Sequence, residues 1–394
     1  FEPEEESPIV FLRINKNFKK RGLKVTSVAT KGSIAMDKLK ADFIKVAPGA
    51  EAAAVAGVAL TAKSVILLGE RASESAGLIS AAVALAEKSG AKLAWIPRRA
   101  GERGALEAGA FPTLLPGGRP VADSAARVDI AAAWGVDSLP ATPGRTTHQI
   151  IEALAAGDLG AVVVGGVDAR DMLHSKKVLD VLKKSFVVSL EIAESSVTEV
   201  ADVVLPVAAV TEKSGSFLNW EGRARSFDAA VSESLNRSDV RILSALADAM
   251  GESIMLGTVS ATAREIAQLG KWEGARAPFT PVAAGSAPAA SGDQAVLTSW
   301  RRLLDMGTMQ RGEDNLAGTR RQTVVVISEK RASAAGVVTG DQVRVSNSNG
   351  SITLSALVED IHDDAVWIPR NSFGSQALTA LDAVHGELVT VVKA

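Results

Sequence analysis

Short apolar runs alternate with helix-like segments along the chain before residue 235, and this rhythm limits the possible folds more than any other feature. Apolar runs rich in Val, Ile and Leu occupy residues 64–69, 92–97, 161–166 and 186–190, with Ala-rich or amphipathic segments among them. Short strands without polar alternation are typical of parallel sheets that are covered on both faces. The rhythm therefore predicts an α/β fold with doubly wound, mostly parallel sheets.

The pattern changes beyond residue 320. Five β-branched runs lie between turn residues there: 323–328, 341–346, 351–358, 365–369 and 387–392. Several short strands in so small a segment predict a β-barrel. We predict four parts: residues 1–60, part of a first α/β domain truncated at its N-terminus; 61–234, a nucleotide-binding-like α/β domain; 235–320, a helical segment and an Ala/Pro/Gly/Ser-rich linker; and 321–394, the small C-terminal barrel.

Composition excludes several classes of function. The chain has no cysteine, so thiolate metal ligands and iron–sulfur clusters are excluded within it. The net charge of −2 gives no electrostatic case for nucleic-acid binding. No apolar run approaches the roughly 18–20 residues that span a bilayer. The acidic start lacks the pattern of a secretion signal, which favours a cytosolic location. The scattered histidines (His148, His174, His362 and His385) are interpreted as ordinary surface or turn residues.

The segment 196–227 combines an apolar strand with an unusual density of polar residues. Glu212 and Glu221 could form an acid–base pair, although nothing in the sequence fixes their separation. Asn219 and Arg223 could present an amide to a heterocycle and a guanidinium fork to a phosphate. The alternative, which we favour, is a hydrogen-bonded hinge whose glycines make turns.

Two further segments have open interpretations. Gly165-Gly166-Val167-Asp168 follows a strand and precedes a helix, where exposed amides could meet a phosphate; glycine there is also explained by a tight turn alone. The loop 97–121 contains four arginines and five glycines. Loops of this length are usually functional or interfacial, so we interpret it as an interface rather than as a merely solvated loop.

Taken together, these segments resemble the molybdopterin oxidoreductase superfamily. The resemblance is carried by ADFIKVAPGAEAA (41–53), by ADVVLP (201–206) with the following E-K-x-G-x-F-x-N-x-E-G-R pattern (212–223), and by the glycine-containing turns of 320–394. The loop 97–121 and the run VILLGER (65–71) are most similar to one branch, the large iron–sulfur subunit (the G subunit) of bacterial NADH–quinone oxidoreductase, respiratory complex I. The resemblance covers nearly the whole chain.

The resemblance implies a fold and a role. It implies a molybdopterin-oxidoreductase-type α/β fold with a dinucleotide-binding-like barrel, in a structural segment without catalytic residues or metal. Vestigial cofactor contacts would be Asp168, Asn219 and Arg223. Active relatives ligate the metal through Cys, selenocysteine, Ser or Asp, and no matching motif stands out here. Where the family often reads Gly-x-Asn/Asp-Pro, this chain reads Gly166-Val167-Asp168-Ala169.

The resemblance also implies the surroundings of the chain. We expect it to belong to a longer polypeptide with iron–sulfur clusters upstream. Its partners would be peripheral-arm subunits of complex I, including the NADH- and FMN-binding subunit, at the cytoplasmic face of the bacterial inner membrane without direct insertion. The alternatives are a fragment of an active molybdenum or tungsten oxidoreductase such as formate dehydrogenase, and a stand-alone nucleotide-binding module.

Overall fold

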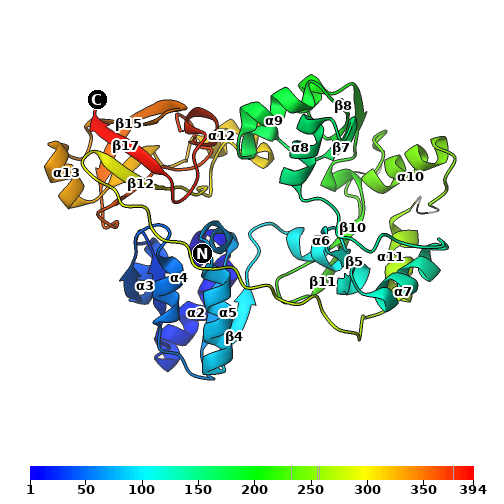
Figure 1. Cartoon of the computed structure of the whole chain (residues 1–394), viewed down its shortest axis with the longest axis horizontal. Coiled ribbons are helices and arrows are strands. Elements are labelled where there is room, and N and C mark those ends of the chain that lie inside the picture. Colours follow the sequence, from blue (N-terminus) through cyan, green and yellow to red (C-terminus); the bar gives the residue numbers. More distant parts are fainter. Residues whose placement is uncertain (232, 255, 257, 376) are drawn as a thin grey trace. The chain divides into compact units, whose positions relative to one another are not determined.

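The computed structural model describes residues 1–394 apart from 232, 255, 257 and 376 (Figure 1). The chain divides into two compact units. The first comprises Phe1–Arg98, Arg170–Ser175 and Thr280–Ala394, and the second comprises Arg99–Ala169 and Lys176–Phe279. Residues 255 and 257 of the predicted segment 235–320 lie outside the described residues.

The first unit begins with helices and two pairs of parallel strands. β1 pairs with β2, and β3 pairs with β4, in parallel register. The elements are α1 (Pro3–Glu6), α2 (Pro8–Arg21), β1 (Thr26–Ala29), α3 (Ile34–Leu39), β2 (Asp42–Lys45), α4 (Glu51–Ala56), β3 (Val65–Leu68), the 3₁₀ helix η1 (Glu70–Glu74), α5 (Leu78–Ser89) and β4 (Lys92–Trp95).

Helix α2 has clear start and stop signals. Pro8 stands at its first position, where a missing N–H costs nothing, and Gly22 ends it in the left-handed conformation with φ 64°. Phe11 is buried with Ala35 and Leu39 of α3, and Ile14 and Phe18 pack against this cluster. One face of α2 is therefore committed to the core.

The rest of the first unit is a closed barrel. Its strands are ordered β12-β16-β13-β15-β14-β17, and its interior holds fully buried residues such as Leu297, Val325 and Ile368. The elements are β12 (Gln294–Thr298), η6 (Thr308–Gln310), α12 (Asp314–Ala317), β13 (Val324–Ile327), α13 (Glu329–Ala335), β14 (Gln342–Asn347), β15 (Gly350–Val358), β16 (Ala365–Trp367), the π-helix η7 (Ala377–Leu381) and β17 (Leu388–Lys393).

The second unit contains a parallel three-stranded sheet, β7-β8-β9. A hairpin of β10 and β11 follows it, and two helices come next. The elements are α6 (Glu102–Glu107), β5 (Leu114–Leu115), η2 (Pro116–Gly118), β6 (Arg119–Pro120), α7 (Ser124–Trp134), α8 (Thr147–Ala156), β7 (Ala161–Gly165), η3 (Ala169–Asp171), α9 (Ser175–Leu182), β8 (Phe186–Glu191), η4 (Thr198–Val200), β9 (Val203–Pro206), η5 (Val210–Glu212), β10 (Gly215–Leu218), β11 (Ala224–Phe227), α10 (Asp239–Ala249) and α11 (Val259–Leu269).

The fold class that the sequence predicts is confirmed: parallel sheets with helices precede a closed barrel. One barrel strand, β12, lies inside the segment that we predict as helix and linker. The sequence did not indicate this strand, because the strands that pair with it, β16 and β17, come much later in the chain. The linker segment around residues 282–285 is hydrogen-bonded to the rest of the first unit. The N–H of Val282 donates to Ser80 Oγ at 2.8 Å, and the N–H of Gly285 donates to the carbonyl of Ala76 at 3.1 Å.

Candidate functional site

Asn219 and Arg223 come together in the turn that joins β10 to β11. The side-chain oxygen of Asn219 accepts hydrogen bonds from the N–H groups of Glu221 (3.0 Å) and Arg223 (2.9 Å). Gly222, with φ 80°, allows this turn. The Arg223 side chain is 62% exposed, and its Nε lies 3.5 Å from a carboxylate oxygen of Glu221. These contacts are those of an Asx-type turn, which agrees with the hinge interpretation.

Asp168 lies elsewhere, just beyond the carboxyl end of β7. Its carboxylate accepts a hydrogen bond from the hydroxyl of Ser196 at 2.7 Å, and that hydroxyl accepts one from the N–H of Ala169 at 3.1 Å. Ser196 and Ala169 are both buried. Open α/β sheets bind ligands at the carboxyl ends of their strands. Here the loops after β7 and β8 are instead joined to each other at that edge.

Glu212 is held as an anion by donors from its own neighbourhood. The N–H of Ala209 lowers its pKa most, followed by the hydroxyl of Ser234 and the amide of Asn236. The Ala209 and Ser234 contacts both measure 2.8 Å. A carboxylate stabilised in this way is a poor general acid at neutral pH, which disfavours Glu212 as the acid of a Glu212–Glu221 pair.

The arginines of the loop 97–121 are largely paired within the chain. Arg99 and Glu102 form an ion pair of 2.9 Å, and Arg103 pairs with Glu107 at 2.5 Å, three and four residues apart. Arg119 is almost fully buried, and its Nη2 lies 2.6 Å from Asp129. These arginines therefore serve local structure. The interface interpretation of the loop stays a prediction.

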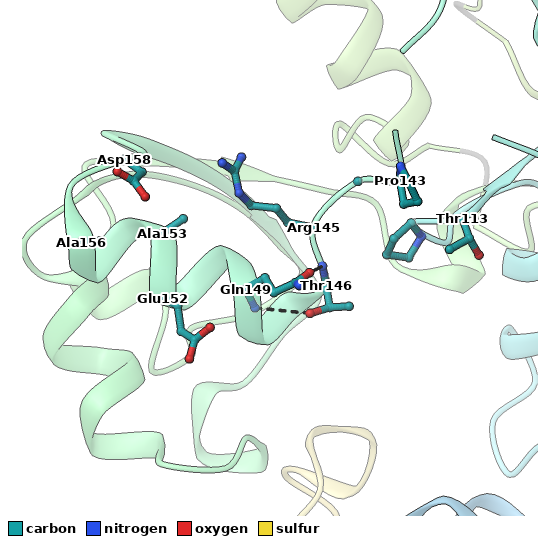
Figure 2. A pocket seen from close by; sticks show the side chains of 11 residues that line it. Thr113, Pro143, Arg145, Thr146, Gln149, Glu152, Ala153, Ala156 and Asp158 are labelled. Carbon is teal, nitrogen blue, oxygen red and sulfur yellow. Dashed lines mark hydrogen bonds between the residues drawn. The ribbon is translucent and has the colours of Figure 1, made fainter. Parts of the chain in front are cut away.

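A solvent-open hollow of about 590 Å³ lies beside α8. Figure 2 shows the side chains that line it. Thr146 and Gln149 cap the helix reciprocally: the N–H of Thr146 donates to the Gln149 side chain at 2.9 Å, and the N–H of Gln149 donates to the Thr146 hydroxyl at 3.3 Å. Arg145 lines the hollow together with the carboxylates of Glu152 and Asp158. Because both signs of charge are present, the hollow has no electrostatic match to a phosphate group.

A largely buried polar cluster lies in the first unit, between α4 and the barrel. One Glu51 oxygen is 3.1 Å from His385 Nε2, and the other accepts from the Ser75 hydroxyl at 2.6 Å. The other ring nitrogen of His385 is 3.1 Å from the hydroxyl of Thr298. Burial tends to raise the pKa of Glu51, but the bonds from His385 and Ser75 outweigh it and lower that pKa. The cluster joins two distant parts of the chain without presenting a group to solvent.

This cluster escaped prediction from the sequence. The interpretation as an ordinary surface or turn histidine does not hold for His385, whose partner Glu51 is 334 positions away. No local spacing marks such a pair. A clue, though a weak one, is that Glu51 follows a Pro-Gly turn at a helix start, where a carboxylate can accept from backbone amides. Its second oxygen does accept from the N–H of Gly49 at 2.7 Å.

Charged and aromatic residues connect the barrel to the carboxyl ends of β1, β2 and β3. Lys31, just after β1, pairs with Glu359 at 2.6 Å, and Lys45 at the end of β2 pairs with Asp360. Glu74, after β3, pairs with Arg370 at 2.8 Å.

An aromatic pair adds to these contacts. Arg71, also after β3, lies 4.5 Å from the ring centroid of Trp300, which is itself 5.2 Å from that of Trp367. The edge at which a ligand would bind in an open sheet is thus occupied by the chain's own side chains.

The start of α5 is covered as well. Gly77 precedes this helix with φ 76°, and a Cβ there would lie 2.5 Å from the Cα of Ala284. Helix starts are natural phosphate sites because their N–H groups lack partners. Here the backbone of residues 282–285 lies against that position.

Parallel sheets followed by a closed barrel define an α/β class of protein, and the comparison with protein families identifies the family. The family described as "Molybdopterin oxidoreductase" matches residues 1–249, and the "Molydopterin dinucleotide binding domain" matches residues 296–390. The chain belongs to the molybdopterin oxidoreductase family.

Individual curated relatives show which members of this family the chain is similar to. The chain is 46% identical over 403 residues to the G subunit of NADH-quinone oxidoreductase from Mycobacterium bovis, covering 99% of this chain and 50% of that protein. It is 43% identical over 413 residues to the G subunit from Streptomyces coelicolor, with 99% and 49% covered. Formate dehydrogenase H of Escherichia coli is 32% identical over 155 residues, covering 38% of this chain and 21% of that protein. The chain spans about half the length of the curated G-type relatives.

Proposed function

We propose that the chain is a structural part of the iron–sulfur G subunit of NADH–quinone oxidoreductase. It supports electron transfer from NADH to quinone, coupled to proton translocation, and catalyses no step itself. The observation that carries the proposal is the 46% identity to a protein of that name along 99% of the chain. The similarity to formate dehydrogenase H is limited to 38% of the chain and favours the alternative less.

The family implies a molybdenum–pterin cofactor, and the residues of this chain do not fit one. A thiolate ligand is excluded because the chain has no cysteine. Asp168, the vestigial candidate beyond the carboxyl end of β7, is engaged with Ser196. Asn219 uses its side-chain oxygen inside its own turn. The described residues also hold no group of three or more His, Asp or Glu suited to a metal ion.

The proposal places the redox groups outside this chain. Iron–sulfur clusters belong to another region of the subunit, and FMN belongs to the NADH-binding partner subunit. Among the described residues, no helix has both the length and the apolar character needed to cross a bilayer. From the similarity to G subunits, we propose contacts with other peripheral-arm subunits at the cytoplasmic face of the inner membrane.

Purification of the full-length protein from its native cell tests the proposal. A tagged copy is isolated under mild conditions, and the isolated assembly is assayed for NADH–quinone activity, iron, molybdenum and tungsten. We expect NADH–quinone activity and iron, with molybdenum and tungsten far below one atom per protein. Stoichiometric molybdenum or tungsten would overturn the proposal in favour of an active pterin enzyme. An assembly without NADH–quinone activity would overturn it too.

A further inference from the structure

Helix α2 exposes a stripe of cations along the face opposite its core contacts. Lys16, Lys19 and Lys20 are exposed, as is Arg13 one turn earlier. These positions follow the three- and four-residue spacing of a single helix face. The opposite face, with Phe11 and Phe18, packs into the core cluster with α3. We call Arg13, Lys16, Lys19 and Lys20 the basic stripe; Figure 1 locates α2.

The three lysines of the stripe have no acidic residue near them in the sequence. Between Glu6 and Asp37 there is none, while seven lysines and arginines occur in that interval. In the part of the chain that the structure describes, Lys16, Lys19 and Lys20 have no ion-pair partner. Arg103 on α6 differs, because it pairs with Glu107 one turn later on the same helix.

Folding alone does not account for the whole stripe. Cations in the last turn of a helix interact favourably with its dipole, which covers Lys19 and Lys20. Lys16, however, lies a turn earlier, and its like-charged neighbours stand three and four positions away, a spacing at which like charges destabilise a helix. A cluster that repels itself within the chain is stabilised by an anionic surface outside it.

The exposed face also has an apolar end. Ile9 is 65% exposed and Leu12 is 55% exposed, both on the same helix face as the lysines. An apolar patch next to unpaired charges is the composition of a protein–protein contact with a polar rim. On the basis of the proposed function, we propose that this face of α2 binds an acidic surface of a neighbouring subunit in the NADH–quinone oxidoreductase assembly.

An anionic lipid surface fits the face less well. Helices that lie on membranes bury a continuous apolar face in the lipid and place their cations along its border. The continuous apolar face of α2 (Val10, Phe11, Ile14 and Phe18) is already used inside the protein. Ile9 and Leu12 stand at the helix end away from Lys19 and Lys20, so they do not form such a face.

Charge reversal in the full-length protein tests the proposal. The variant Lys16→Glu/Lys19→Glu/Lys20→Glu is expressed with a tag in the native cell. The measured quantity is the NADH–quinone activity that co-purifies with each tagged protein, which we call retention. We expect retention at least about tenfold lower than for the unaltered protein, because opposite charges at the contact become like charges. The matched control is Lys176→Glu/Lys177→Glu/Lys184→Glu, which changes the net charge equally at three exposed lysines in and just after α9.

A neutral variant guards against a folding defect. Lys16→Gln/Lys19→Gln/Lys20→Gln removes the mutual repulsion, so its melting temperature should equal or exceed that of the unaltered protein while retention still falls. Unchanged retention in the reversed variant would overturn the proposal, as would an equal loss in the α9 control.

The lipid alternative and the proposed function are separated by two further measurements. Sedimentation with phosphatidylglycerol–phosphatidylcholine vesicles should leave the unaltered protein in solution; binding that the reversed variant loses would replace the acidic subunit with a membrane. If the unaltered protein itself retains no NADH–quinone activity, the proposed function fails and the inference fails with it. If the unaltered and reversed proteins retain it equally, only the inference fails.

Discussion

The barrel of the first unit and the three-stranded sheet of the second differ in how they pair their strand edges and bury their apolar side chains. Every barrel strand has two neighbours, and its interior residues, Leu297 and Val325 among them, are fully buried. In the sheet, β7 and β9 each have one strand neighbour among the described strands. Val163 is 53% exposed, Phe186 51% and Val203 38%, all on one sheet face.

The difference teaches where the chain obtains its stability. Closure removes strand edges and encloses apolar side chains without help from helices. An open parallel sheet needs a cover on both faces, and the face of β7-β8-β9 that carries Val163 is only partly covered in this chain. We therefore expect substitutions in the barrel interior to cost much more than substitutions on the open sheet face.

The largest expected effect is the removal of a barrel core side chain. Leu297→Ala should lower the free energy of unfolding of the barrel by about 2–5 kcal/mol, because it removes a fully buried leucine and leaves a cavity. The measurement is urea-dependent hydrogen exchange of the amides of β13 and β15. Val338→Ala, at an exposed residue (66%) between α13 and β14, is the control and should have little effect. Equal effects for both would contradict the idea that the interior dominates.

An intermediate loss of stability is expected when the buried Glu51 of α4, which contacts His385, is replaced. Glu51→Gln should cost about 1–3 kcal/mol at pH 7, since a buried acceptor of three hydrogen bonds changes. The pKa of Glu51 is lowered from 4.5 in the folded protein, so its carboxylate contributes stability above that pH. That contribution is lost as the pH falls through the folded value.

Melting curves over a pH series check the sign of this effect. The difference between the unaltered protein and Glu51→Gln should be full at pH 6–7 (about two units above the unfolded pKa) and should shrink steadily below pH 4.5. Glu199→Gln, at an exposed carboxylate, provides the control. A difference that grows toward acid would mean that Glu51 is not stabilised as the anion.

The smallest effect is expected on the open sheet face. Val163→Thr keeps the β-branched shape at a half-exposed position and should change stability by no more than about 0.5 kcal/mol. Val187→Thr, on the opposite face of the neighbouring strand and fully buried, should cost about 1–3 kcal/mol. Thermal unfolding of the two single variants makes the comparison. If both cost the same, the face that carries Val163 is covered after all.

Local patterns predicted much of the fold. The β-branched run at 323–328 became β13, and the apolar run at 186–190 became β8. β12 escaped prediction because its surroundings are rich in Ala, Pro, Gly and Ser and its pairing partners lie far along the chain. A strand of this kind is defined by tertiary pairing, which local propensity does not contain.

The contacts of the candidate site residues are also of two kinds, those within one turn and those between segments far apart in the sequence. Asn219 and Arg223 could be associated from the sequence because one tight turn holds them both. The bond between Asp168 and Ser196 joins the loops after two neighbouring strands, and the bond between Glu51 and His385 joins two distant parts of the sequence. Such contacts depend on how the elements pack, so residue type and spacing could not predict them.

The strand order of the barrel has a consequence for synthesis on the ribosome. β17 pairs with β12 on one side and with β14 on the other, and it is the last strand in the chain. While translation proceeds, β12 and β14 therefore emerge with unpaired edges and must wait for β17. Nascent chains with exposed strand edges are substrates for chaperones. The barrel is thus closed only after β17 has been synthesised.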